Sequence, residues 1–448
     1  MTQKSTKCRP NRRHVIAGAF ALAAMPVRSE IQDYDVIVVG AGVAGMAAAR
    51  HLQAAGKTVL VVEAANIVGG RAFTESTSFG VPFDHGCSWL NDAPNNPLVS
   101  YVRDQGFTLK EHTSAGEAYF SGDRRANAGE RRALNKGWDS VEDALYRAGE
   151  QGLDVSADSV IPRGKGDTGN AETWIGPMDW GVDFTDLSTL DYWNTADSQP
   201  SFIVREGLGR ALGTLVDDLS VQLGTAVTGI DWSGQGVKVE TTRGTLSAKT
   251  CIVTVSTGVL AAGHIRFTPA LPVKKQEAIS NVPMGLLVKI GLQFSAGQYG
   301  FIPNQWLSYR VPDTPPTRAC YFLTWPFDFD YSIGFVGGSF GWELSRAGPE
   351  AAIDFALGEF VRMAGSDARK HFVKGVMSGW ASNPYTLGAY AAAKPGHFSA
   401  REVLGEPVGD RVFFAGEAMG GSHVALCSGA FKSGEQTART ILASGVLQ

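Results

Sequence analysis

Short apolar runs and stretches of helical periodicity alternate at the start of the chain. Residues 34–39 are a short, mostly apolar run that predicts a buried strand. Residues 46–54 carry small apolar side chains at helical spacing and predict a helix, and the apolar residues 58–62 predict a second strand. This order is typical of parallel sheets with helices on their faces. We therefore expect the α/β fold class, beginning with a Rossmann-like unit.

Later segments of the chain have the same character. We expect an amphipathic helix at residues 207–219 and strands at 237–240 and 250–255. Residues 412–417 are another apolar run, which ends in a glycine and an acid. The first domain is therefore expected to be assembled from separated segments, with two insertions forming an α+β substrate domain. The predicted boundaries are 31–105, 202–270 and 376–448 for the first domain, and 106–201 and 271–375 for the second.

One inserted stretch, residues 174–194, is unusually rich in aromatic side chains. We favour an interpretation in which these side chains form core beneath a lid. The alternative is that they contact the substrate directly.

A glycine motif joins the first expected strand to the first helix. Gly40, Gly42 and Gly45 form G-x-G-x-x-G, with Val43 and Ala44 among the residues between them. Gly40 allows a tight turn, Gly42 lets backbone N–H groups approach a pyrophosphate, and Gly45 lets the helix pack against the strand. The N-terminus of the helix would face the phosphate charge. The motif therefore predicts a dinucleotide site.

The acid after the second expected strand narrows the choice of dinucleotide. Glu63 stands where a carboxylate accepts hydrogen bonds from the adenosine ribose. The alternative is a solvated acid at a strand end. A carboxylate at this place disfavours a 2′-phosphate and hence NADP, while NAD and FAD both remain open.

Composition narrows the class of protein. The 448 residues suit two domains, and 44% apolar with 19% charged residues is typical of soluble globular proteins. The net charge of -4 gives no indication of nucleic acid or anionic membrane partners. The sequence contains no uninterrupted apolar run of about 18 residues, so we expect no membrane span. The five cysteines are widely separated and form no CxxC pair, so we expect buried thiols and no metal site.

The N-terminus has the layout of an export signal. A basic head precedes a short apolar stretch at residues 15–27, and Arg12-Arg13 resembles a twin-arginine signal. We expect residues 1–30 to be a signal peptide and the mature protein to be periplasmic. The alternative is a basic tail on a cytosolic protein.

A second glycine motif distinguishes between NAD and FAD. Gly69, Gly70 and Arg71 form a G-G-R run that resembles the second signature of the FAD-dependent amine oxidase superfamily. From about residue 33 onward the chain resembles the flavin-containing amine oxidases, and in particular the polyamine oxidases and flavin monoamine oxidases. The resemblance implies a glutathione reductase-like FAD-binding domain. Further segments that match in the order of the family are 84–89, 96–98, 225–227, 253–260, 267–272, 282–289, 416–417 and 429–435.

The resemblance also assigns roles to single residues. Lys289 is implied to reach a water bound at flavin N5, where the alternative is a surface lysine, and Trp380 lies in the segment over the flavin face. Tyr385 matches one of two aromatic walls around the substrate amine, while the second wall falls on Leu426. The residues implied to bind the cofactor are Gly40, Gly42, Val43, Ala44, Gly45, Glu63, Gly70, Arg71, Gly86, Cys87, Ser88, Trp89, Val227, Gly416, Glu417, Ala425 and Leu426.

Two positions depart from the family. Pro384 stands where monoamine oxidases carry the cysteine that bonds to the flavin, so we expect FAD to be bound non-covalently. Asn91 and Asp92 replace an ionisable pair of the polyamine oxidases. Asp92 either receives a distal ammonium of the substrate or is an exposed loop acid.

The function implied is oxidation of an amine C–N bond to an imine, followed by hydrolysis to an aldehyde or ketone. Dioxygen or a periplasmic electron carrier would reoxidise the flavin. An L-amino-acid oxidase would need an arginine for the carboxylate, and residues 86–90 contain none. A flavoprotein that dehydrogenates carbon–carbon bonds, or that binds FAD as a scaffold, is the third alternative.

Overall fold

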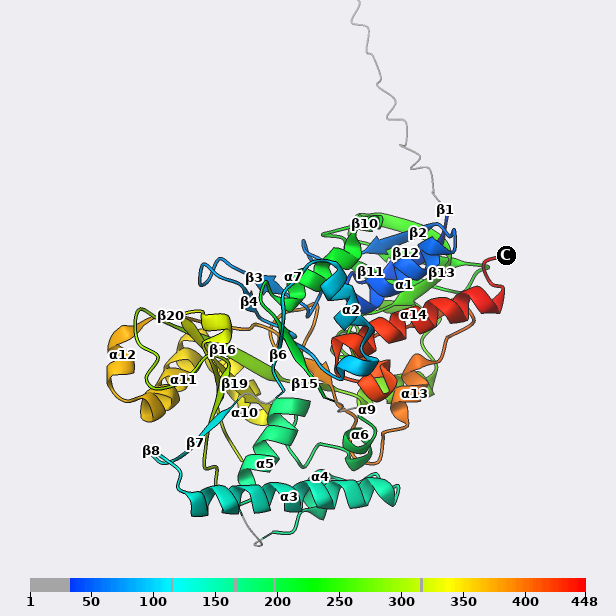
Figure 1. Ribbon diagram of the computed structural model, residues 1–448. Helices are drawn as coiled ribbons and strands as arrows, with labels where there is room; N and C mark the ends of the chain where they lie inside the picture. Colours follow the sequence, from blue (N-terminus) through cyan, green and yellow to red (C-terminus); the bar gives the residue numbers. More distant parts are fainter. Residues whose placement is uncertain (1–32, 114–115, 164–166, 196–198, 315–316) are drawn as a thin grey trace, which may run out of the picture. The chain divides into compact units, whose positions relative to one another are not determined.

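The first strand, helix and second strand follow the predicted order (Figure 1). β1 (Asp33–Val39) and β2 (Val59–Val62) are parallel neighbours, and α1 (Val43–Ala54) connects them. The helix begins three residues earlier than predicted, because Gly42 takes its N-cap position and the second half of the glycine motif is already helical. The computed structural model describes residues 33–113, 116–163, 167–195, 199–314 and 317–448, so the predicted signal peptide lies outside the described residues.

Strands from both ends of the chain meet in a sheet of eight strands. At its centre, Ile252 of β13 (Gly244–Val253) lies between Val38 of β1 and Phe413 of β22 (Val412–Phe414), and all three strands are parallel. The strand order is β10-β2-β1-β13-β12-β11-β14, with β22 beside β13. The remaining strands of this sheet are β10 (Val221–Gln222), β11 (Val227–Asp231), β12 (Val237–Thr241) and β14 (Arg266–Thr268).

The helix predicted at residues 207–219 is shorter than expected. α7 (Leu208–Gly213) is followed directly by a 3-10 turn, η3 (Thr214–Val216), and the helical conformation ends there. The strands predicted at 237–240 and 250–255 correspond to β12 and to the second half of β13.

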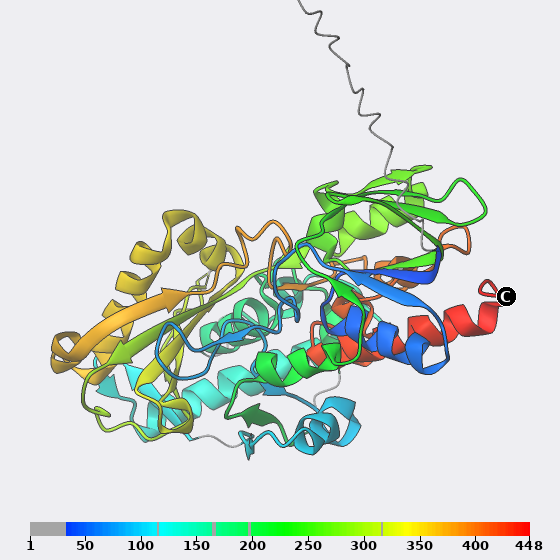
Figure 2. The same ribbon diagram turned by 90° about the horizontal axis from the view of Figure 1, so that it is seen from above.

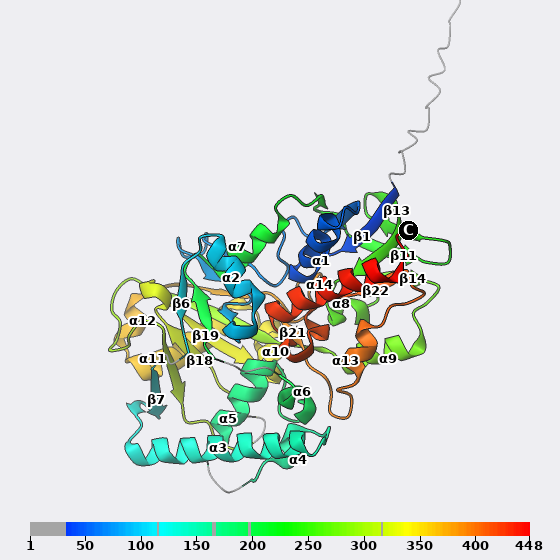
Figure 3. The same ribbon diagram turned by 45° about the vertical axis from the view of Figure 1, so that its right-hand side comes forward.

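The last helix lies beside the first one. α14 (Cys427–Ser444) packs along α1 in both Figure 1 and Figure 3. A Cβ added to Gly434 would lie 2.1 Å from the carbonyl oxygen of Ala44. This close approach of two helix backbones therefore requires glycine.

A second sheet of seven strands is mainly antiparallel, and the helices α10 (Gly338–Ala347) and α11 (Pro349–Ala364) pack against it (Figure 2). Its core contains many large aromatic side chains, including Phe294, Phe322 and Phe360, all at most 2% exposed. In sheet order the strands are β20 (Phe372–Met377), β16 (Leu287–Phe294), β19 (Tyr331–Gly337), β18 (Tyr321–Thr324), β17 (Gln305–Tyr309), β7 (Glu117–Ser121) and β8 (Arg124–Arg125).

A group of helices at the bottom of Figure 1 carries the aromatic-rich stretch. α3 (Ala128–Glu150) begins with a capping box, in which Asn127 and Glu130 each bond the backbone of the other. Beside it are α4 (Ala157–Val160), α5 (Gly169–Thr173), the π-helical turn η2 (Trp174–Trp180) and α6 (Thr189–Trp193).

The remaining elements are short. Three small sheets consist of β3 (Thr74–Glu75) with β4 (Phe83–Asp84), β5 (Trp89–Leu90) with β9 (Phe202–Val204) and β6 (Leu109–Glu111), and β15 (Met284–Gly285) with β21 (Tyr390–Ala391). The other helices are α2 (Pro97–Asp104), α8 (Thr257–Ala261), α9 (Val273–Asn281), α12 (Asp367–His371) and α13 (Ala400–Gly405). The 3-10 turns are η1 (Ala93–Asn95), η4 (Pro326–Asp328), η5 (Glu417–Met419) and η6 (Gly421–His423).

Asp33–Gln448 forms one compact unit. The eight-stranded sheet takes its strands from the segments predicted for the first domain, while the division into two domains stays a prediction. Among the described helices, none combines the length and apolar character that a membrane crossing requires.

Candidate active site

One large cavity of about 780 Å³ runs between the two sheets. Every residue that the resemblance assigned to catalysis or to cofactor binding lines this cavity except Gly45. Residues from both ends of the chain, such as Gly42 and Leu426, therefore share one wall. What each of them would contact in a bound cofactor stays a prediction.

The cofactor end of the cavity begins at the N-terminus of α1. Gly42 is the N-cap of this helix, and no side chain caps it. Its φ of -74° is ordinary, and a Cβ placed there would meet no atom within 4 Å, so the backbone at Gly42 borders open space. A Cβ on Gly45 would lie 2.0 Å from the carbonyl oxygen of Gly40. Gly45 is thus needed for packing of the helix on the turn, whereas Gly42 leaves room for a ligand.

Glu63 lies at the end of β2 and is 9% exposed, so the alternative of a solvated strand-end acid is wrong. Its carboxylate accepts hydrogen bonds from the backbone N–H groups of Ala41, at 2.7 Å, and Ala65, at 2.8 Å. Burial raises the pKa of Glu63, while these backbone hydrogen bonds lower it. Because each carboxylate oxygen accepts more than one hydrogen bond, the side chain retains capacity for a ribose hydroxyl.

An ion pair joins the second glycine motif to the last part of the chain. Nη1 of Arg71 lies 2.7 Å from Oε1 of Glu417, and Arg71 also donates to the carbonyl oxygen of Ala389 at 2.9 Å. Glu417 is 7% exposed, and both side chains line the cavity. Arg71 therefore has a fixed partner and is not a free surface arginine.

Lys289 comes from β16 and reaches across to the segment that precedes β5. The residue is 4% exposed, so the alternative of a surface lysine is wrong. Its ammonium donates to the carbonyl oxygens of Asp84 and Gly86 and to the hydroxyl of Ser88. The same ammonium lies 5.6 Å from the ring centre of Trp89, which favours the charged form of the amine.

Burial and a nearby acid have opposite effects on the pKa of Lys289. Burial lowers the pKa of Lys289 to about 8, while the charge of Asp84 opposes this shift. Burial in turn raises the pKa of Asp84, and Lys289 opposes that shift. A cation whose pKa lies near neutrality is suited to a site where negative charge develops.

The segment predicted to lie over the flavin face forms the adjoining wall. Trp380 is 8% exposed, and its indole nitrogen donates to the carbonyl oxygen of His85 at 2.9 Å. Tyr385 is 47% exposed and lines the cavity together with Pro384. Leu426 lines the same cavity, so the two predicted walls share one space although only one of them is aromatic.

A family comparison agrees with this geometry. Residues 43–176 and 179–442 match the family described as flavin containing amine oxidoreductase. The chain belongs to this family. It is therefore a flavin-dependent oxidoreductase that acts on amines.

Relatives of this amine oxidase include polyamine oxidase 4 of Oryza sativa subsp. japonica. The two chains are 30% identical over 437 residues, which are 89% of this chain and 87% of the relative. The lysine-specific histone demethylase 1 homolog 1 of the same organism is 27% identical over 91% of this chain but only 52% of its own length.

Solved structures support the fold of the amine oxidase. Putrescine oxidase in its wild-type form bound to putrescine has a TM-score of 0.76 at 20% identity, covering 92% of this chain and 99% of the other. Cyclohexylamine oxidase from Brevibacterium oxydans IH-35A has a TM-score of 0.75 at 22% identity, with the same coverage. At these identities the likeness shows the α/β fold with its FAD-binding and substrate parts, and no more.

The cavity fits the flavin cofactor, such as FAD, that the family implies. The uncapped N-terminus of α1 offers backbone donors to phosphate charge, and Glu63 offers an acceptor for hydroxyl groups. Val227 lines the same end, where the sequence analysis placed an adenine. Lys289 lines the other part of the cavity, where its ammonium would stabilise the negative charge of a reduced flavin.

The sequence analysis missed an aromatic wall of the amine oxidase's cavity. Trp306 stacks on Trp89 with ring centres 5.8 Å apart, and Trp174 meets Trp306 edge-on at 5.0 Å. Phe335 lies 5.5 Å from Trp306. No motif marks Trp306 or Phe335, because each belongs to an ordinary strand whose neighbours in space are distant in the sequence.

The prediction for the aromatic-rich stretch is correct in part. Phe184 is 5% exposed and belongs to a hydrophobic core cluster, as the lid interpretation required. Trp180 also belongs to this core cluster, and Trp174 and Tyr192 pack against core clusters. All three line the cavity as well, so direct contact with the substrate stays open as the alternative for them.

Two further expectations are corrected. Asp92 is not an exposed loop acid, because it is 1% exposed and lies 3.0 Å from Nε2 of His423. It is also absent from the cavity lining among the described residues, so it is not placed to receive a substrate ammonium. The expectation of buried thiols holds for Cys251 and Cys320, whereas Cys87 and Cys427 are half-buried and line the cavity. These two are distant in the sequence but close in space, since a hydrogen bond with Cys427, together with burial, raises the pKa of Cys87.

Proposed function

We propose that this protein oxidises the C–N bond of an amine to an imine with non-covalently bound FAD, and that water then hydrolyses the imine to an aldehyde or ketone. The observation that carries the proposal is a buried Lys289 at the junction between the cofactor end of the cavity and its aromatic end. When bound, the flavin supplies the chemistry, because its N5 accepts the hydride equivalent from the carbon next to nitrogen.

The protein's own contribution would be binding, orientation and exclusion of water. The aromatic rings of Trp89, Trp174, Trp306 and Phe335 form an apolar wall against which the body of an amine packs. The ammonium of Lys289 would stabilise negative charge nearby, which favours transfer of electrons to dioxygen or to another acceptor. Its three N–H donors are engaged with Asp84, Gly86 and Ser88, so a water held by Lys289 would take the place of one of these acceptors. A buried apolar wall also favours the neutral, reactive form of the amine.

The cavity also has an acidic end. Glu142 and Asp179 line it beside Tyr146 and Tyr192. Carboxylates and aromatic rings together favour an amine that enters as a cation with an apolar body. The relatives named for polyamines, putrescine and cyclohexylamine support amines of this size and charge.

The alternative of an L-amino-acid oxidase is less well supported. Among the described residues that line the cavity, Arg71 is the one arginine, and it is paired with Glu417. Recognition of a substrate carboxylate normally requires a free arginine in bidentate contact. The alternative of a carbon–carbon dehydrogenase gives no role to Lys289.

Two finer points belong to the same proposal. Pro384 carries no nucleophile at the position of the monoamine oxidase cysteine, which supports non-covalent FAD. We also propose that the protein is exported to the periplasm, folded, by the twin-arginine route. Fractionation that recovers only full-length enzyme, with Met1, from the cytosol would overturn the export proposal.

Anaerobic bleaching of the flavin absorbance tests the function directly. The purified enzyme would be mixed with diamines and polyamines, arylalkyl amines, cyclic amines and L-amino acids in separate cells. We expect at least one amine to bleach the flavin fully and the amino acids to leave it oxidised. Bleaching by amino acids alone would favour the amino-acid oxidase, and no bleaching by any amine would contradict the proposal. Acid precipitation should leave the flavin in the supernatant.

A further inference from the structure

Two ion pairs hold one short segment, residues 389–393, which forms part of the cavity wall. The first pair is Arg71 with Glu417. Arg71 donates to the carbonyl oxygen of Ala389 at 2.9 Å, and Glu417 accepts from the backbone N–H of Ala391 at 3.2 Å. This pair itself lines the cavity.

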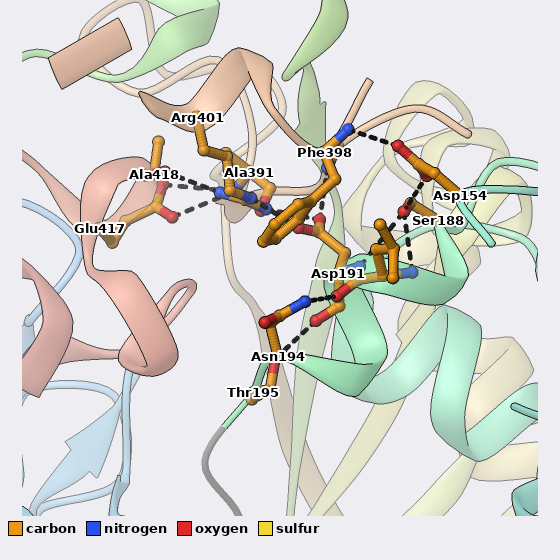
Figure 4. A network of polar contacts seen from close by, with 12 residues as sticks. Asp154, Ser188, Asp191, Asn194, Thr195, Ala391, Phe398, Arg401, Glu417 and Ala418 are labelled. Carbon is orange, nitrogen blue, oxygen red and sulfur yellow. Dashed lines mark hydrogen bonds and ion pairs between the residues drawn. The ribbon is translucent and has the colours of Figure 1, made fainter. Parts of the chain in front are cut away.

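The second pair approaches the same segment from the other side and is shown in Figure 4. Nε and Nη2 of Arg401 both lie 2.7 Å from the carboxylate of Asp191, whose side chain is fully buried. Arg401 donates to the carbonyl oxygen of Ala391 at 2.9 Å and to that of Ala418 at 2.8 Å, while Asp191 accepts from the N–H of Ala393 at 2.6 Å. Ala391 is therefore bonded by both pairs.

Asp191 and Arg401 do not line the cavity themselves, but Tyr390 and Tyr192, which lie next to their contacts, do line it. Tyr390 lies within the clamped segment and lines the cavity, and its hydroxyl donates to the carbonyl oxygen of Met178 at 2.6 Å. Tyr192 follows Asp191 directly in α6 and lines the cavity as well. Asp191 and Arg401 thus connect a helix at the substrate end with the ion pair at the cofactor end.

We propose that Asp191 and Arg401 are positioning residues, which set the places of Tyr390 and Tyr192 in the substrate cavity relative to the cofactor. The proposal rests on the proposed amine oxidation. This buried bidentate ion pair also bonds three backbone groups at once, the carbonyl oxygens of Ala391 and Ala418 and the N–H of Ala393, and such a charge-assisted network is rigid. A wall held in this way keeps the reacting carbon at one distance from the flavin.

The expected consequence is a loss of orientation with little loss of cofactor. Displacing a substrate by about 1 Å costs about 100-fold in rate, so we expect the limiting rate of flavin reduction to fall about 10- to 100-fold. The ratio of rates for cyclohexylamine and putrescine should also change, because the shape of the wall changes. The dissociation constant for FAD should stay within about twofold, since Arg71 and Glu63 are untouched.

The variant that tests this is the double substitution Asp191→Leu with Arg401→Met. Removing one charge alone would leave its partner buried and unpaired, whereas replacing both by apolar side chains of similar volume is often neutral for stability. A second variant, Arg401→Lys, keeps the charge but cannot reach Asp191, Ala391 and Ala418 together. It provides the test if the double variant does not fold.

A matched control is the double substitution Arg163→Met with Glu172→Leu. This pair also joins two polar side chains of the helical group, at 2.6 Å, with Glu172 buried, and neither residue lines the cavity. Stopped-flow reduction with each amine gives the limiting rate and the amine dissociation constant separately. Visible circular dichroism of the bound flavin reports the cofactor environment independently of turnover.

The inference is overturned if Asp191→Leu/Arg401→Met and Arg401→Lys reduce the flavin at the rate, affinity and amine selectivity of the control. It is also overturned if the control loses these properties to the same extent, because the effect would then be general loosening. If no amine reduces the wild-type flavin, the proposed function fails instead. In that case an altered dichroism spectrum in the test variants, without change in the control, still supports the positioning role.

Discussion

The indole nitrogen of Trp89 donates to Nδ1 of His112 at 3.0 Å, directly beside the substrate end of the cavity. Nε2 of His112 lies 3.0 Å from the carbonyl oxygen of Asn304. Since an indole can only donate and a carbonyl can only accept, the imidazole is neutral with its proton on Nε2. His112 therefore fixes the orientation of the tryptophan that faces Lys289.

Replacing His112 by Phe should destabilise the protein by about 1–3 kcal/mol, because the indole N–H of Trp89 and the carbonyl of Asn304 would both lose their partner in a buried place. Urea denaturation at neutral pH measures this. His112→Gln, whose amide both accepts and donates, should recover part of the loss. Equal stability of all three proteins would show that the hydrogen bonds contribute nothing.

The same histidine predicts a pH dependence of stability. Burial lowers the pKa of His112 below its usual 6.5, so the unfolded state binds more protons than the folded state. The stabilising contribution is complete above pH 6.5 and is lost as the pH falls through the unfolded pKa toward the folded one. The difference in unfolding free energy between wild type and His112→Gln should therefore shrink on acidification, and a constant difference would contradict the assignment.

Lys289→Met should separate the two halves of the catalytic cycle. Methionine keeps the apolar stem and removes the charge, so reoxidation of the flavin should slow by about 10²–10³-fold while anaerobic reduction by an amine changes less. Stopped-flow absorbance measures both rates on one preparation. If a folded, flavin-loaded variant reoxidises at the wild-type rate, Lys289 does not act at flavin N5.

Lys289 also predicts how reoxidation depends on pH. Because burial lowers the pKa of Lys289 to about 8, its ammonium is charged below that pH and neutral above it. Reoxidation of the wild-type flavin should therefore slow as the pH rises through about 8. This change of rate near pH 8 should be absent in Lys289→Met. If it persists in that variant, another group is responsible for it.

Glu63→Ala should weaken FAD binding by roughly 1–3 kcal/mol, because a ribose acceptor is lost and the N–H groups of Ala41 and Ala65 lose their partner. Fluorescence titration of the apoprotein measures the dissociation constant. Glu63→Gln, which keeps one acceptor oxygen, should fall between wild type and Glu63→Ala. Unchanged affinity in both variants would end the ribose assignment.

Two glycines of one motif should respond in opposite ways to alanine. Gly45→Ala should lower stability by about 1–3 kcal/mol, because its Cβ would overlap the carbonyl oxygen of Gly40 and this overlap exceeds the gain in helix propensity of about 1 kcal/mol. Gly42→Ala has open space and an ordinary φ, so the protein should fold normally and bind FAD more weakly. Thermal unfolding of both variants measures the loss of stability expected for Gly45→Ala. FAD titration of both variants measures the loss of affinity expected for Gly42→Ala.

Local patterns predicted the turn, strand and acids that meet at one end of the cavity, because dinucleotide-binding motifs have particular residues at fixed spacing. The turn at Gly40, the strand that ends at Glu63 and the apolar run before Glu417 were all predicted in this way. The burial of Asp92 beside His423 was not, because it depends on two loops that are more than 300 residues apart. The aromatic wall around Trp306 was missed for the same reason, since a strand pattern shows that a side chain is buried but not what it faces.

The pairing of β22 with β13, and of Arg71 with Glu417, has a consequence for how the protein is made. The turn at Gly40 emerges from the ribosome long before β22 and Glu417, which complete one wall of the cavity. Domains generally begin to fold during synthesis from the N-terminal side. Here a nascent chain that ends before residue 412 lacks the strand and the acid that close the cavity, so capture of the cofactor must await synthesis of residues 412–417.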